Sequence, residues 1–152
     1  MNNPDTGLYY RRAAVQQATS AGLMVIVYDM LVDDLRRAIV AVRNDDIEAR
    51  SGLLKHAFTV LELLEGSLDH RYNENGTKSL SRFYEFVRNQ LLAAQFQSND
   101  QLLEQQIGLV LDVREAWRQA DADALAQLRN DNPTTIVEPA FSEDWMTSQW
   151  FA

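Results

Sequence analysis

The chain of 152 residues contains no cysteine and two histidines. Without cysteine, disulfides, thiolate metal sites and cysteine nucleophiles are excluded. A di-iron site in a helical bundle needs Glu-x-x-His on two helices, but the residues three positions before His56 and His70 are Leu53 and Ser67. We therefore expect no metal site, no other cofactor and no enzymatic activity, with both histidines on the surface.

Basic residues and long hydrophobic runs are also scarce. Lys and Arg total 14 against 22 acidic residues, a net charge of −8, which disfavours nucleic-acid binding through phosphate contacts. The most apolar run, Leu23–Val32, contains only one charged residue, Asp29, but it is far shorter than the roughly 20 residues that cross a bilayer. The opening residues Met1–Asp5 lack the basic and apolar regions of a signal peptide. We expect a cytoplasmic protein without membrane insertion.

What the sequence has instead is apolar residues at three- and four-residue spacing, the helical period. Turn and capping residues separate the periodic segments, beginning with Thr19 or Ser20 and continuing with Asn44-Asp45-Asp46. A third signal is Asn75-Gly76, followed by Thr77 or Ser79 as a cap, and a fourth is Gln97–Asp100. The predicted helices are 20–43, 46–68, 80–96 and 101–120, with a further short helix at 121–128.

Long helices joined by short polar turns predict an all-α fold, an antiparallel up-down four-helix bundle. Because no segment alternates with period two, we expect no strands. The predicted organisation is an N-terminal arm (1–18), a helical bundle domain (19–128) and an acidic, aromatic C-terminal tail (129–152). The run Leu23–Val32 is apolar on all sides, so we expect other segments to enclose it.

Two of the predicted helices carry more apolar surface than one packed face requires. At 100° per residue, the apolar arc covers roughly 220° in the second helix and about 200° in the fourth, against little more than 100° for a core-facing stripe. One interpretation is that these helices are central, or are covered by the arm and tail. The other is that flanks around Leu63 and Leu111 form grooves for helical segments of a partner.

A series of short motifs runs through residues 10–120. They are Tyr10, Val15, Thr19, Tyr28-Asp29, Asn44–Ile47, Leu80 with Phe83-Tyr84, Asn99-Asp100 and Arg114–Trp117. Their order and spacing resemble the flagellar export chaperone family FliS. That family usually has a proline after the cap and a glycine after Tyr-Asp, where this chain has Ser20 and Met30.

The resemblance implies a chaperone that binds the C-terminal segment of flagellin, prevents its premature polymerisation and assists its export, with the flagellar export gate as a candidate second partner. The candidate partner-binding residues are Tyr10, Val15, Phe58, Val60, Leu63, Ile107 and Leu111. Thr19, Tyr28 and Asp29 form the first-helix family motif and are interpreted as structural.

The alternative is a non-enzymatic helical binding module with a different helical client. We expect the tail to pack on the bundle through Trp145 or Trp150 and to compete with the client. A second copy covers an apolar groove as readily as a tail does, which leaves a homodimer as a further alternative.

Overall fold

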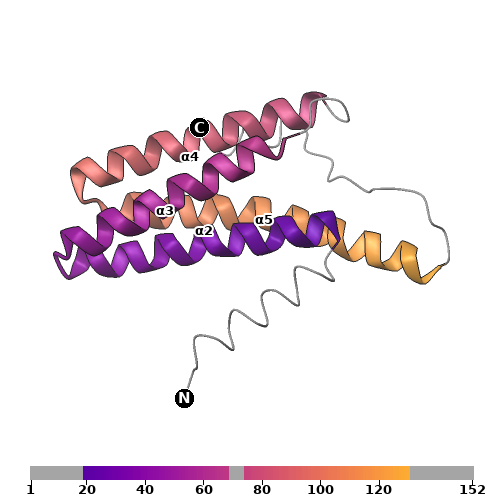
Figure 1. Ribbon diagram of the computed structural model, residues 1–152, viewed down its shortest axis with the longest axis horizontal. Coiled ribbons are helices and arrows are strands. Elements are labelled where there is room, and N and C mark those ends of the chain that lie inside the picture. The colour runs from indigo at the N-terminus through magenta and orange to yellow at the C-terminus, as the bar shows by residue number, and fades with distance from the viewer. Residues whose placement is uncertain (1–18, 69–73, 131–152) are drawn as a thin grey trace, which may run out of the picture.

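The computed structural model describes residues 19–68 and 74–130, and in these residues every regular element is an α-helix. The helices are α2 (Ser20–Arg43), α3 (Ile47–Gly66), α4 (Glu74–Gln97) and α5 (Asp100–Arg129). Successive helices run in opposite directions, and α2 and α4 each pack against both α3 and α5 (Figure 1). This arrangement confirms the predicted all-α bundle.

The predictions for the arm and the tail fall outside the described residues. They concern Tyr10 and Val15 in the arm, and Trp145 and Trp150 in the tail. The prediction that His70 lies on the surface falls outside them as well.

Capping side chains begin three of the helices where the sequence predicted. Thr19 Oγ1 accepts a hydrogen bond from the Gly22 amide at 2.9 Å and caps α2. Asp46 caps α3 through the Ala49 amide at 3.1 Å, and Asn99 caps α5. Each cap satisfies one of the amides that the first helical turn leaves unpaired.

The third helix begins six residues earlier than predicted, at Glu74 rather than Leu80. The signal Asn75-Gly76 was interpreted as a turn, but Gly76 lies within the helix and does not take a positive φ. Gly76, Thr77 and Ser79 are buried. Tertiary burial of this turn therefore outweighs the low helix propensity of glycine.

The predicted break at residue 120 was also wrong. Helix α5 continues through Asp121–Leu128 to Arg129 as one helix of 30 residues. Between residues 109 and 129 the sequence contains neither glycine nor proline, and Gln119 Nε2 donates to Asp123 Oδ1 across the predicted junction at 3.1 Å. Nothing in the sequence interrupts the helix, and its last turns extend past the start of α2 (Figure 1).

Tyr28 of α2 and Tyr84 of α4 meet in the centre of the core. Their hydroxyl oxygens are 2.7 Å apart and hydrogen-bonded, and their rings pack edge to face. Burial raises the pKa of both tyrosines above the ordinary value. This confirms the interpretation of Tyr28 as a core residue with its hydroxyl satisfied. Trp117 packs against the same core while remaining partly exposed.

The apolar residues of α2 differ in burial along the helix. Leu31, Leu35 and Ala38 are fully enclosed in the core. By contrast, each residue of Leu23–Val27 is partly exposed. The start of α2 therefore presents apolar surface that the neighbouring helices cover incompletely.

Candidate functional site

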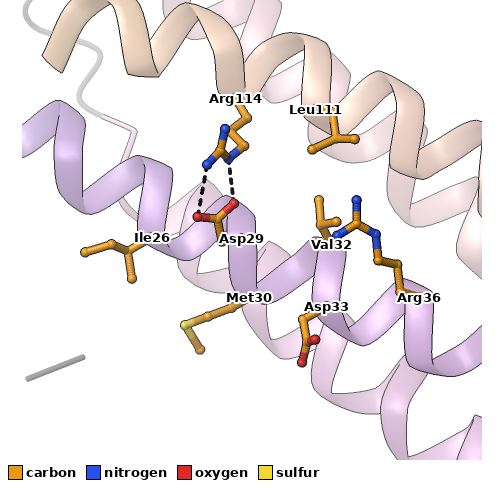
Figure 2. A pocket seen from close by; sticks show the side chains of 8 residues that line it. All are labelled: Ile26, Asp29, Met30, Val32, Asp33, Arg36, Leu111 and Arg114. Atoms are coloured by element: carbon orange, nitrogen blue, oxygen red, sulfur yellow. Dashed lines mark hydrogen bonds and ion pairs between the residues drawn. The ribbon is translucent and has the colours of Figure 1, made fainter. Parts of the chain in front are cut away.

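Two of the short sequence motifs meet across the α2–α5 interface. The Arg114 guanidinium on α5 makes a two-point contact with the Asp29 carboxylate on α2, with Nε–Oδ1 at 2.5 Å and Nη2–Oδ2 at 3.3 Å (Figure 2). The hydrogen bond to Asp29 raises the pKa of Arg114. Residues separated by 85 positions in the sequence thus form one contact.

This ion pair lines a groove between α2 and α5 with a volume of about 570 Å³. The groove is lined by Ile26, Asp29, Met30, Val32, Asp33, Arg36, Leu111 and Arg114. Leu111 and Arg114 project from α5 toward α2, as Figure 2 shows. The mixture of aliphatic and charged side chains is suited to an amphipathic peptide segment, which would bury apolar atoms between charged margins.

The three residues interpreted as structural all make contacts within the bundle. Thr19 caps α2, and its hydroxyl also donates to Asp121 Oδ1 on α5 at 2.6 Å. Tyr28 bonds to Tyr84, and Asp29 pairs with Arg114. These contacts link the first helix to α4 and α5.

The described partner-binding candidates differ widely in exposure. Leu63 is 60% exposed on α3. Phe58, Ile107 and Leu111 are partly buried and pack against the core. Val60 is only 3% exposed and offers no surface to a partner while the bundle is closed, because its position on α3 faces the core.

The structure does not bring these candidates together into one surface. Leu63 belongs to α3 and Leu111 to α5, and these helices occupy opposite corners of the bundle, each packed between α2 and α4. A single short helix could not cover both residues. A client contacting both would have to wrap around the bundle.

The sequence prediction missed two exposed apolar residues on α4. Phe96 is 85% exposed, and Leu92, one helical turn earlier, is also exposed. Both lie off the buried stripe of α4 that ends with Leu91 and Ala94. The same angle count that singled out Leu63 would have found them, since Leu92 lies about 100° from Leu91 around the helix.

His56 contacts a carboxylate, as an acid–base site would require. Its Nδ1 lies 2.5 Å from Oδ2 of Asp34, which is buried. The His56 side chain is however 53% exposed and does not line the α2–α5 groove. Within residues 19–68 and 74–130, no three His, Cys, Asp or Glu side chains are grouped so as to hold a metal ion. The pair joins α2 to α3, with the imidazole half exposed and the carboxylate buried.

None of the four described helices combines the length and the hydrophobicity needed to cross a membrane. An antiparallel bundle with a groove and exposed apolar side chains has the features of a helical protein-binding module. The fold therefore places this protein among antiparallel helical bundles whose apolar surface is incompletely covered.

Comparison with known proteins identifies the family. The family model described as "Flagellar protein FliS" matches residues 1–124. The chain therefore belongs to the FliS family of flagellar proteins.

Curated relatives agree with the family match. The chain is similar to "Flagellar secretion chaperone FliS" of Bacillus subtilis (strain 168), with 28% identity over 120 residues, covering 79% of this chain and 87% of the relative. The protein of the same name from Salmonella typhimurium (strain LT2) is 27% identical over 116 residues, covering 76% and 86%. The one from Escherichia coli (strain K12) is 23% identical over 109 residues, covering 71% and 80%. The family match ends before the last turns of α5.

Proposed function

We propose that this protein is a cytoplasmic chaperone that binds the C-terminal segment of flagellin, keeps it from polymerising prematurely and assists its export. The observation that carries the proposal is the FliS family match over residues 1–124. The curated relatives, named flagellar secretion chaperones, support it further. The flagellar export gate is the proposed second partner.

The apolar surface of the bundle supports a binding role. The partly exposed residues Leu23–Val27, the α2–α5 groove and the exposed Leu63 and Phe96 are spread over all four helices. A client that folds as it binds loses conformational entropy and needs a large interface to offset the loss. Dispersed apolar sites suit a long segment that wraps the bundle better than one short peptide.

When no client is bound, the apolar surface of the bundle is exposed to water unless another segment packs on it. We propose that the arm near Tyr10 lies over part of it, because the arm joins α2 at Thr19, close to the partly exposed Leu23–Val27. The tail, joined to α5 at Asn130, is the proposed competitor of the client. A second copy of the chain is the alternative cover, and sedimentation analysis of the free protein would detect the dimer.

One observation favours the second candidate function, a binding module with a different helical client. Met30, found where the family usually has glycine, lines the α2–α5 groove together with Leu111. A long side chain there alters the shape that a client must match. A client pulled down with the protein in place of flagellin would favour this second function.

The test is calorimetric titration of the full chain with a synthetic C-terminal segment of flagellin from the same organism. We expect micromolar or tighter binding with a negative heat-capacity change, because apolar surface is buried. A scrambled segment of the same composition serves as the control. Absence of binding by both the full chain and a chain lacking residues 133–152 would overturn the flagellin proposal.

A further inference from the structure

Helices α4 and α5 border a second groove, with a volume of about 460 Å³. Phe86 and Gln90 line it from α4, and its α5 wall includes Gly108 and Asp112, which are likewise one helical turn apart. Because the lining residues recur one turn apart on both antiparallel walls, the groove runs along the helix axes. Its direction suits a third helix lying beside α4 and α5.

Gln106 is a polar residue buried where an apolar one would be expected. It is 2% exposed, lines the α4–α5 groove, and its Oε1 has no hydrogen-bond partner among the described residues. A buried acceptor without a donor destabilises the free protein, and a methionine of similar size would remove that cost. The flexible side chain of Gln106 can turn its amide into the groove, where an occupant would supply the missing donor.

Gly108 is a second residue that the free bundle does not explain. It lies in the interior of α5, where glycine destabilises a helix relative to other residues. A Cβ placed on Gly108 would meet no atom within 4 Å, so no neighbouring helix requires a glycine there. The missing side chain leaves room for another backbone to approach α5 closely.

We propose that the α4–α5 groove binds one helix of the client, which places a small residue against Gly108 and directs a side-chain N–H or O–H donor to Gln106. The donor comes from a side chain because the backbone amides of a helix interior are already bonded within that helix. The partly exposed Phe86 and Leu109 supply the apolar contact along the groove. The inference rests on the proposed flagellin function, since it locates one helix of the flagellin segment in the α4–α5 groove.

Gly108→Gln tests the close approach, and Gly52→Gln is its matched control. Gly52 is likewise exposed inside a helix, and a Cβ placed on it would meet nothing within 4 Å, but it lies on α3, away from the groove. Both substitutions should raise Tm, by about 2–4 °C, because glutamine has the higher helix propensity. In titration of the full-length proteins with the flagellin segment, Gly108→Gln should weaken binding about tenfold or more through steric overlap, whereas Gly52→Gln should leave it unchanged.

Gln106→Met tests the proposed hydrogen bond from the client to Gln106. It should leave Tm unchanged or raise it, while weakening binding of the same segment by about fivefold. If the wild type and both groove variants bind equally well, the groove assignment is overturned and the flagellin function stands. If neither the wild type nor a chain lacking residues 133–152 binds, the function is overturned and the assignment falls with it.

Discussion

Helix α2 and the α4–α5 groove differ in how their polar groups are satisfied. Tyr28, Asp29 and Asp34 of α2 bond to Tyr84 on α4, Arg114 on α5 and His56 on α3, so this one helix has a polar link to each of the other three. In the α4–α5 groove, by contrast, the buried Oε1 of Gln106 has no partner among the described residues.

The difference separates polar groups that hold the bundle together from a buried acceptor that the described residues leave unpaired. Removing one member of an internal pair leaves the other unsatisfied and lowers stability. Removing an unpaired group deletes an existing penalty instead, so Gln106→Met should act in the opposite direction. Among the hydrogen-bonded pairs of α2, the expected loss of stability on disruption decreases from the buried tyrosines to the half-exposed ion pair.

The largest effect concerns the two core tyrosines at alkaline pH. Because burial raises the pKa of Tyr28 and Tyr84, the folded protein keeps both protons above pH 10 while the unfolded chain loses them. Their contribution to stability is complete below about pH 10 and is lost as pH rises, by up to ~3 kcal/mol per unit for the two together. Urea unfolding at pH 9, 10 and 11 measures this slope.

Tyr84→Phe is the matched variant for that measurement. It removes one of the two buried hydroxyls and should reduce the slope above pH 10 by about half. An identical slope in the wild type and the variant would show that other groups control the alkaline transition.

His56→Ala should have the next largest effect. It leaves the buried Asp34 carboxylate without its hydrogen-bond partner on α3, and we expect a loss of about 2 kcal/mol in the free energy of unfolding at pH 7. Lys55→Ala, at an exposed neighbouring position on α3, is the control and should change stability little. The double variant Asp34→Ala/His56→Ala should be less destabilised than the two single losses added together.

The Asp29–Arg114 pair should contribute less, because the Asp29 side chain is half exposed and the pair is partly screened by solvent. In a double-mutant cycle with Asp29→Ala and Arg114→Ala, we expect a coupling energy of about 1 kcal/mol. Adding 1 M salt should reduce it. A coupling energy of zero would show that the Asp29–Arg114 pair does not stabilise the packing of α2 against α5.

Local signals predicted the parts of the fold that local physics controls. Thr19, Asp46 and Asn99 each lie in a segment that the sequence predicted as a cap, because a capping side chain bonds an amide within its own turn. Gly76 misled the prediction, since its position in α4 depends on burial against other helices. The continuation of α5 past Ala120 was missed because a change in apolar pattern was mistaken for a helix end.

The candidate site was predicted less well, since an angle count around one helix does not show where neighbouring helices lie. The wide apolar arc of the second predicted helix included both Val60 and Leu63, but a neighbouring helix covers Val60 and leaves Leu63 exposed. The α4–α5 groove was not predicted at all. Its two informative residues, Gln106 and Gly108, stand out only once burial and free space are known.

Leu63→Asp should have the smallest effect on stability and still weaken client binding. Because Leu63 is 60% exposed, the free energy of unfolding should change by no more than about 0.5 kcal/mol. If the client wraps across α3, an aspartate there would be desolvated in the interface, and affinity for the flagellin segment should fall about tenfold. Leu128→Asp is the control, with the same chemistry at a residue that is 64% exposed and lies beyond the family match. Equal affinity for Leu63→Asp and Leu128→Asp would confine the client to the grooves beside α5 and leave the outer face of α3 free.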